Sequence, residues 1–354
     1  MSFFSRVKAS YFSHPLYGHG YQCQGGYGGT LYEVDNVSEL LTAAAASGSK
    51  TIRFTTAGTY TLTEDLDIDS SYVTIENSSG GAVVLTGGGL RIGSSVTDVY
   101  VSGVEVDRGD IAITAANQGD PIHVNSLCDR LYFYKCAFYH GVDDSSVRSG
   151  GVTFDLCQFG PNWDSQYNDE SESNGDTGHA FGPFTTAEST GASFVYCLFH
   201  SLEDRAPQFA KGNNYARGCV TYNSQLGPTI GSGGGAAYGE FVNCSVIDGP
   251  ETTPGLQQMG FRINSLASGV VRNCLVDGSR DSETDPDIDA VFPSDTSRLV
   301  DFDPTVNRFP RPAPDTAAND RAYTIANVGP SNPSATLAAY LAHVNAGTGS
   351  ILRS

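Results

Sequence analysis

The segments YKCAF (134–138), FDLCQF (154–159), FVYCLF (194–199), FVNCSV (241–246) and VRNCLV (271–276) follow nearly one pattern. The pattern consists, in order, of an apolar residue, two further positions, cysteine, any residue and another apolar residue. Cys219, in GCVTYN (218–223), falls in the gap between the third and fourth segments, and successive cysteines are 21, 40, 22, 25 and 30 residues apart. Short strands repeated with variable loops are typical of a solenoid whose coils share one cross-section. The pattern therefore predicts a parallel β-helix.

The cysteines have two interpretations. Cysteine is small and apolar, so equivalent cysteines on coils about 4.8 Å apart can form an internal ladder. The eight cysteines could instead form four disulfides. We favour mostly reduced thiols, because ladder neighbours point the same way and this orientation disfavours the disulfide dihedral. Cys23 and Cys128 lie outside the ladder and could pair.

Segments on either side extend the same architecture. Residues 50–106 alternate in short apolar stretches that Gly, Ser or Asp interrupt, as coils turning corners do. Before them, NVSELLTAAAAS (36–47) has helical spacing, with Asn36 or Ser38 as the N-cap, and can seal the open end of the solenoid. We predict one all-β domain over 1–354, with coils over about 22–280. The tail, 281–354, is expected to be irregular, with a short helix in SATLAAYLAHVNAGTG (334–349), and to pack on the outside.

The charge of the chain restricts its partners. Its formal net charge is −19, which disfavours nucleic acid and anionic membranes. No stretch reaches the roughly 18 apolar residues that span a bilayer, and the first residues contain no apolar core of signal-peptide length. An acidic polymer would also be repelled, unless screening beyond about 8 Å and bound cations relieve the repulsion locally.

Several segments, in order, resemble the pectate lyase family (polysaccharide lyase family 1). They are GGYGGTLYEVDNVSELLTAAAASGSKTIRF (25–54), YVTIENSSGGAVVLTGGGLRI (72–92), DRLYFYKCAFYHGVDDSSVRSGGVTFDLCQF (129–159), SFVYCLFHSLEDRAPQF (193–209) and VNAGTGSIL (344–352). The resemblance implies a right-handed parallel β-helix that cleaves uronate polymers such as pectate by Ca²⁺-assisted β-elimination. It also implies an extracellular protein whose partner is an acidic polysaccharide, and we expect a monomer.

Arg205, in FHSLEDRAPQF (199–209), is the candidate catalytic residue. In the family an arginine followed closely by proline acts as the base, and DRAPQF is similar to that arrangement. Arginine is an unusual base, because only about one guanidinium in a million is neutral near pH 7. The alternative is a structural ion pair between Arg205 and Glu203 or Asp204.

Three aspartates are the candidate calcium ligands. The resemblance places Asp120, in NQGDPIHV (117–124), and Asp143 and Asp144, in HGVDDSS (140–146), at positions where the family carries acids. Two further family acids are replaced here, by Gln118 and by Ser145 or Ser146. Fewer charged ligands weaken Ca²⁺ binding. The alternative for the Asp-Asp pair is an ordinary solvated turn.

Lys211 and His179 are candidate substrate-binding residues, because their positions resemble those of groove residues in the family. Two other functions stay open. A polygalacturonase-type hydrolase would use paired carboxylates, such as Asp120 with Asp143 or Asp144. A non-catalytic carbohydrate-binding β-helix, as in a viral or surface recognition protein, would bind a glycan without cleaving it.

Overall fold

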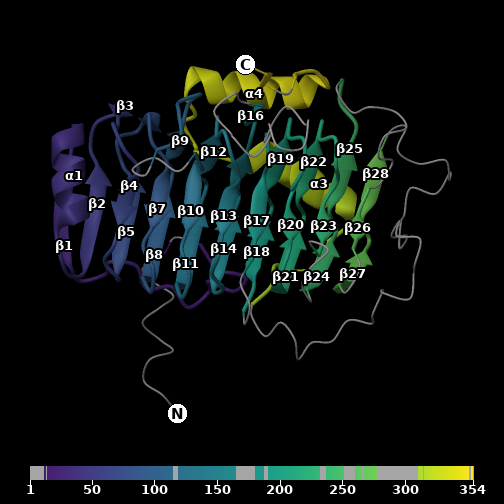
Figure 1. Cartoon of the computed structure of the whole chain (residues 1–354), viewed down its shortest axis with the longest axis horizontal. Helices are drawn as coiled ribbons and strands as arrows, with labels where there is room; N and C mark the ends of the chain where they lie inside the picture. The colour runs from purple at the N-terminus through teal and green to yellow at the C-terminus, as the bar shows by residue number, and fades with distance from the viewer. Residues whose placement is uncertain are drawn as a thin grey trace, which may run out of the picture.

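The computed structural model describes residues 12, 14–114, 119–164, 180–186, 190–231, 237–250, 260–264, 267–277, 310–313, 315–350 and 352–353. These residues form a right-handed parallel β-helix, as the sequence predicts, with three long sheets of strands running side by side along the molecule (Figure 1). Every strand pair in these sheets is parallel, and each coil contributes one strand to each sheet in turn.

We name the sheets A, B and C, each in its spatial order. Sheet A contains β1 (Thr30–Val34), β2 (Lys50–Phe54), β5 (Val73–Asn77), β8 (Thr97–Ser102), β11 (Asp129–Tyr134), β14 (Val152–Asp155), β18 (Ala192–Val195), β21 (Gly212–Arg217), β24 (Ala237–Val242) and β27 (Ala267–Arg272). Sheet B contains β28 (Leu275–Asp277), β25 (Ser245–Ile247), β22 (Val220–Tyr222), β19 (Leu198–His200), β15 (Gln158–Phe159), β12 (Ala137–Tyr139), β9 (Glu105–Asp107), β6 (Val83–Thr86) and β3 (Gly58–Thr61). Sheet C contains β26 (Arg262–Ile263), β23 (Thr229–Ile230), β20 (Gln208–Phe209), β17 (Pro183–Thr185), β13 (Ser145–Val147), β10 (Ile122–Val124), β7 (Leu90–Ile92) and β4 (Leu66–Ile68). A fourth, two-stranded sheet pairs β16 (Trp163–Asp164) with β29 (Leu352–Arg353).

The repeated cysteine marks the corner between sheets A and B. The residue just before each cysteine has a positive φ, which turns the chain within a single residue; these residues are Lys135, Leu156, Tyr196, Gly218, Asn243 and Asn273. The registers of sheet B place the six cysteines at equivalent positions in successive coils. All eight cysteines of the chain are buried and free, including Cys23 and Cys128. The interpretation as an internal ladder of thiols is confirmed.

Phenylalanines stack in two columns inside the same coils. Phe133 and Phe154 lie with their ring centroids 4.8 Å apart, and Phe154 and Phe194 lie 5.2 Å apart. A second column joins Phe138 to Phe159 at 5.3 Å and Phe159 to Phe199 at 5.4 Å. These distances are close to the spacing of neighbouring strands, so each coil adds one ring to each column. The columns make a continuous core along the helix axis.

Helix α1 (Val37–Ala45) covers the N-terminal end of the solenoid, as predicted (Figure 1). Asn36 is its N-cap, with its side chain accepting a hydrogen bond from the backbone N–H of Glu39. The fully buried Lys50 donates from Nζ to the carbonyls of Ala44 and Ala46 at the other end of the helix. A cation there satisfies carbonyls that have no partner within the helix. Lys50 therefore joins α1 to the second strand.

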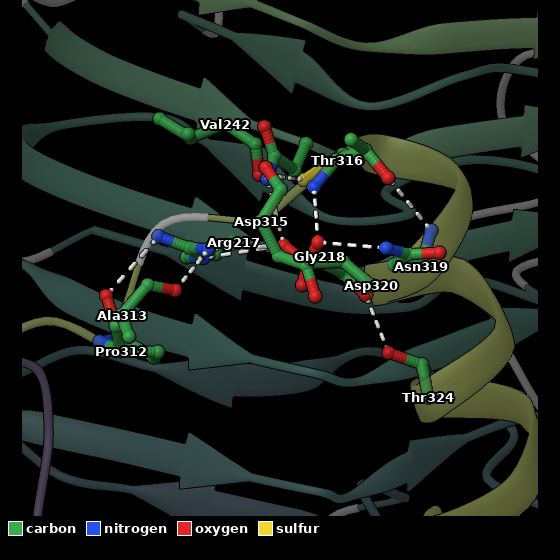
Figure 2. A network of polar contacts seen from close by, with 12 residues as sticks. Arg217, Gly218, Val242, Pro312, Ala313, Asp315, Thr316, Asn319, Asp320 and Thr324 are labelled. Carbon is green, nitrogen blue, oxygen red and sulfur yellow. Dashed lines mark hydrogen bonds and ion pairs between the residues drawn. The ribbon is translucent and has the colours of Figure 1, made fainter.

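The described part of the C-terminal tail contains two helices, where the sequence predicts one. Helix α3 (Ala317–Asn327) precedes α4 (Ala335–Ala346), and both lie along the outside of the solenoid (Figure 1). Figure 2 shows how α3 is held. Arg217 of β21 donates to the carbonyls of Pro312 and Ala313 at 3.2 and 2.7 Å and pairs with Asp320 of α3. Thr324 Oγ1 donates to the carbonyl of Gly218 at 2.5 Å. Within the described residues, no helix is long and apolar enough to cross a membrane.

Helix α4 is fixed to sheet B by a buried carboxylate. Glu105 of β9 accepts hydrogen bonds from the backbone N–H and the hydroxyl of Ser334, both at 2.6 Å, and from Tyr139 Oη at 2.8 Å. Ser334 is also the N-cap of α4, because its Oγ accepts a hydrogen bond from the N–H of Leu337. One serine therefore both starts the helix and attaches it to the solenoid.

We expect Ser334→Ala to lower the free energy of unfolding by about 1–2 kcal/mol, because it removes the cap and leaves one oxygen of Glu105 with one donor fewer. Denaturant titration measures this change. Ser331→Ala, a serine in the same tail, serves as the control. An unchanged denaturation midpoint in Ser334→Ala would contradict the attachment.

Candidate functional site

The outward face of sheet C carries a row of mainly polar side chains. The register of the sheet aligns the middle residue of each strand with the next: Asp67, Arg91, His123, Ser146, Phe184, Gln208, Thr229 and Arg262. Because residues alternate along a strand, their neighbours, such as Ile92 and Val124, point into the core. Asp120, Asp143, Phe181 and Arg205 each lie three residues before a member of this row, in the turns that lead into the strands of four consecutive coils. The fold therefore brings the predicted catalytic residue to the same edge of sheet C as the predicted calcium ligands.

Arg205 lies in the turn before β20 and reaches back across the preceding coil. Its Cζ lies 4.5 Å from the ring centroid of Phe181 and 4.3 Å from that of Phe184, at distances typical of cation–π contact. Its Nη1 forms an ion pair with Asp144. The partner differs from the two that the sequence suggests, because Asp204 instead accepts from the backbone N–H of Arg205 at 2.6 Å.

The backbone of Arg205 is strained. Its φ is +59°, in the left-handed region that non-glycine residues seldom adopt. The Asp204 hydrogen bond and the two aromatic rings hold this conformation. The side chain is 20% exposed, and its Nε is buried. Strain held in place by its surroundings is common at functional sites.

Asp120 is buried and bound to a histidine. It is 4% exposed, and its Oδ2 lies 2.7 Å from His123 Nδ1. Burial raises the pKa of Asp120 well above its ordinary value; the charge of Asp143 raises it further, and Ser146 and Arg148 partly offset the rise. Burial likewise lowers the pKa of His123 to about 4, so this imidazole is neutral at pH 7. One carboxyl of the predicted calcium set is therefore enclosed and only weakly inclined to ionise.

Arg108, a residue with no predicted role, is fully buried and interacts electrostatically with these acids. It follows β9, and its guanidinium donates to the carbonyls of Gly109, Ile111 and Ala112. Burial lowers the pKa of Arg108, and the negative charges of Asp65, Asp120, Asp110 and Asp143 raise it. The acidic edge of sheet C thus contains an internal cation.

Comparison with solved structures identifies the architecture. A pectate lyase from Paenibacillus sp. 0602 matches with a TM-score of 0.62 and 14% identity, covering 93% of this chain and 98% of its own. The chain has the pectate lyase fold. The thermostable pectate lyase PL 47 matches with a TM-score of 0.62 at 13% identity, covering 90% of this chain and 98% of its own. The enzyme from Bacillus sp. N165, solved with trigalacturonate, matches at 0.58 and 12%, covering 88% and 98%. No protein-family model and no curated protein matches the sequence.

The calcium that the pectate lyase resemblance implies does not fit the side chains as they are arranged. Asp144 is paired with Arg205, and Asp120 with His123. Asp143 interacts electrostatically with Arg108 and Asp120. Among the residues that the structure describes, no three His, Cys, Asp or Glu side chains are grouped to hold a metal ion. A calcium site needs several oxygen ligands that are free to face the ion, and here Asp144 already faces Arg205 while Asp120 is buried against a neutral imidazole.

The other candidates lie apart or outside the described residues. Lys211 follows β20, three residues after Gln208, whereas Arg205 precedes Gln208 by three, so the two are at opposite ends of this short strand. His179 and Gln118 lie outside the described residues. Arg108 could have been noticed in the sequence only as the single basic residue of VDRGD (106–110), one of few cations in an acidic chain. Its spacing from Asp120 gives no indication of contact.

Proposed function

We propose that this chain is a polysaccharide lyase that acts on a uronate-containing polymer, pectate or a relative, at the outward face of sheet C. The observation that carries the proposal is the position of Arg205, whose side chain is 20% exposed and whose guanidinium is held over two aromatic rings at the acid-bearing edge of that sheet. The pectate lyase fold supports it, since proteins with that fold have been solved with a hexasaccharide and with trigalacturonate. An extracellular location belongs to the same proposal.

The chemistry requires a strong positive charge. β-Elimination removes a proton next to a uronate carboxylate, so negative charge develops beside a group that is already negative. A guanidinium can bind a carboxylate through two parallel hydrogen bonds and stabilise that charge. Arg262 in the row of sheet C is a further cation, whereas the charge of Arg91 is offset by Asp67. Such local cations, together with screening by salt, let a polyanion approach a protein whose net charge is −19.

Arg205 is the proton acceptor in this proposal, and two steps follow from its surroundings. The carboxylate of Asp144 must first leave the guanidinium, and a substrate carboxylate is the natural group to displace it. The guanidinium must then lose a proton before it can accept one, and alkaline solution favours that loss. We therefore expect the rate to be higher in alkaline solution than near pH 7.

The experiment is to incubate the protein with polygalacturonate at several pH values and to follow two signals. A lyase produces an unsaturated uronate that absorbs in the near ultraviolet, together with new reducing ends. A hydrolase produces reducing ends without that absorbance, and would favour the paired carboxylates of Asp120 and Asp143. Absence of both products at all of these pH values would overturn the lyase.

A non-catalytic glycan-binding role is favoured by one observation, the ion pair that occupies Arg205. If Asp144 stays on the guanidinium when the polymer binds, Arg205 remains a cation and no proton is removed. Polygalacturonate would then bind without either product. Affinity electrophoresis in a gel that contains polygalacturonate detects such binding.

A further inference from the structure

The acidic edge of sheet C is unusual because its carboxylates are covered. Asp65, before β4, is 8% exposed, and its Oδ1 accepts from the N–H of Gly89 at 2.8 Å. Asp120 is 4% exposed and Asp144 is 7% exposed. Buried carboxylates are costly unless positive charge or hydrogen bonds compensate them. Those carboxylates of this edge that ionise in the folded chain therefore need positive charge or hydrogen bonds nearby.

Arg108 supplies positive charge to this edge from inside the protein. It is one of the largest fully buried side chains of the described residues, and an arginine is seldom fully buried without a partner. The charges of Asp65, Asp120 and Asp143 favour its cationic form, and three backbone carbonyls accept its hydrogen bonds. Its guanidinium is thus fixed by the backbone, and the negative charges of acids from three coils act on it.

Arg205 is the second cation at this edge of sheet C. Its guanidinium pairs with Asp144, one coil beyond Asp120 along the sheet. The rings of Phe181 and Phe184 hold it there. Two guanidinium groups carry the same total charge as one calcium ion, and they divide between them the carboxylates that the sequence suggests as calcium ligands.

We propose that Arg108 and Arg205 take the place of a bound calcium ion, as built-in cations at the edge that carries Asp120, Asp143 and Asp144. The native chain consequently binds no calcium at this edge, and a chelator does not affect it. Removal of either arginine leaves a set of carboxylates without their cation. Because oxygen-rich sites with several negative charges are those that Ca²⁺ prefers, such a variant gains calcium affinity.

The test compares the native chain with Arg108→Gln, in the absence of any polysaccharide. Thermal unfolding is followed by circular dichroism, in EDTA and in about 10 mM CaCl₂, a concentration that would fill even a weak extracellular-type site. A ligand that binds only the folded state raises the unfolding temperature. We expect no shift for the native chain, a lower unfolding temperature for Arg108→Gln in EDTA, and recovery of about 5 °C or more with calcium.

Arg108→Lys is the matched control, since it keeps the positive charge and should show no response to calcium. MgCl₂ in place of CaCl₂ separates site binding from general screening, because Mg²⁺ does not readily give up its waters. A calcium-dependent shift in the native chain would overturn the inference. So would a folded Arg108→Gln whose unfolding temperature is the same in EDTA and in calcium.

Arg205→Gln is the second variant, in case Arg108→Gln does not fold under either condition. Arg205 is partly exposed, so its replacement is tolerated more easily, and it releases Asp144. We expect calorimetry to detect saturable calcium binding to Arg205→Gln and none to the native chain. Absence of binding to this variant would overturn the inference. Neither measurement uses a substrate, so the result does not depend on whether the chain is a lyase.

Discussion

Arg205→Ala is expected to lower the rate of ultraviolet-absorbing product formation from polygalacturonate by about 10³-fold. The variant removes the proton acceptor and the cation that meets the substrate carboxylate, and it leaves Asp144 facing the bound polymer with an uncompensated charge. Both effects raise the barrier to elimination. Initial rates at saturating polymer, measured by absorbance at a fixed alkaline pH, give the size of the loss.

Arg91→Ala is the matched control, because Arg91 also lies on the outward row of sheet C and is also paired with a carboxylate, that of Asp67. Its loss should change the rate by less than about tenfold, as expected for a residue that contributes only attraction. Arg205→Lys keeps a charge but loses the planar donor pair, and should recover only a small part of the activity. Equal rates for Arg205→Ala and Arg91→Ala would remove Arg205 from the proposed mechanism.

Asp155→Asn is expected to stabilise the protein, and increasingly so as the pH rises. Asp155 of β14 is 3% exposed and accepts a hydrogen bond from Tyr132 Oη at 2.7 Å. Burial raises the pKa of Asp155 to about 7, although the bond from Tyr132 and the charge of Lys135 partly offset this. Asparagine retains an acceptor for Tyr132 and has no proton to lose.

The direction of this pH dependence follows from the number of protons that the folded and unfolded chains bind. Between about pH 4 and about pH 7 the unfolded chain has released the proton of Asp155 and the folded chain still holds it, so native stability falls as the pH rises. The stability difference between Asp155→Asn and the native chain should grow over that interval by up to about 4 kcal/mol. Denaturant titrations at several pH values measure it. Asp129→Asn, at a carboxylate that is 50% exposed, should show no such growth, and parallel curves for Asp155→Asn would contradict the prediction.

The coils could be predicted because each one repeats a local rule. A one-residue corner needs a positive φ, which asparagine tolerates at positions 243 and 273, and the next residue must be small and apolar. That rule appears in the sequence as a cysteine at each corner, although the residue before it varies from lysine and leucine to asparagine. Helix α3 was missed because AANDRAYTIAN has few apolar residues at helical spacing. It is held by polar contacts with Arg217 and Gly218, which are about a hundred residues away in the sequence.

The candidate site also combines features that the sequence predicts with features that only the structure shows. The alignment of Asp120, Asp143 and Arg205 on one edge follows from coil repetition, and the resemblance indicated those positions. Two findings could not be read from the sequence: Arg205 reaches across a coil to Asp144, and Arg108 lies buried beside the acids. Both depend on side-chain direction and on loop paths, and residue spacing does not encode either one.

The column of six thiols makes it possible to follow local unfolding of the solenoid. Each sulfur is buried in the native state. A thiol-specific alkylating reagent can therefore modify a cysteine only after its coil has separated locally from the neighbouring coils. Mass spectrometry of peptides collected during slow labelling would then give the labelling rate of each cysteine, and so the order in which the coils open. The chain thus carries its own set of natural probes for whether the solenoid frays from one end or breaks in the middle.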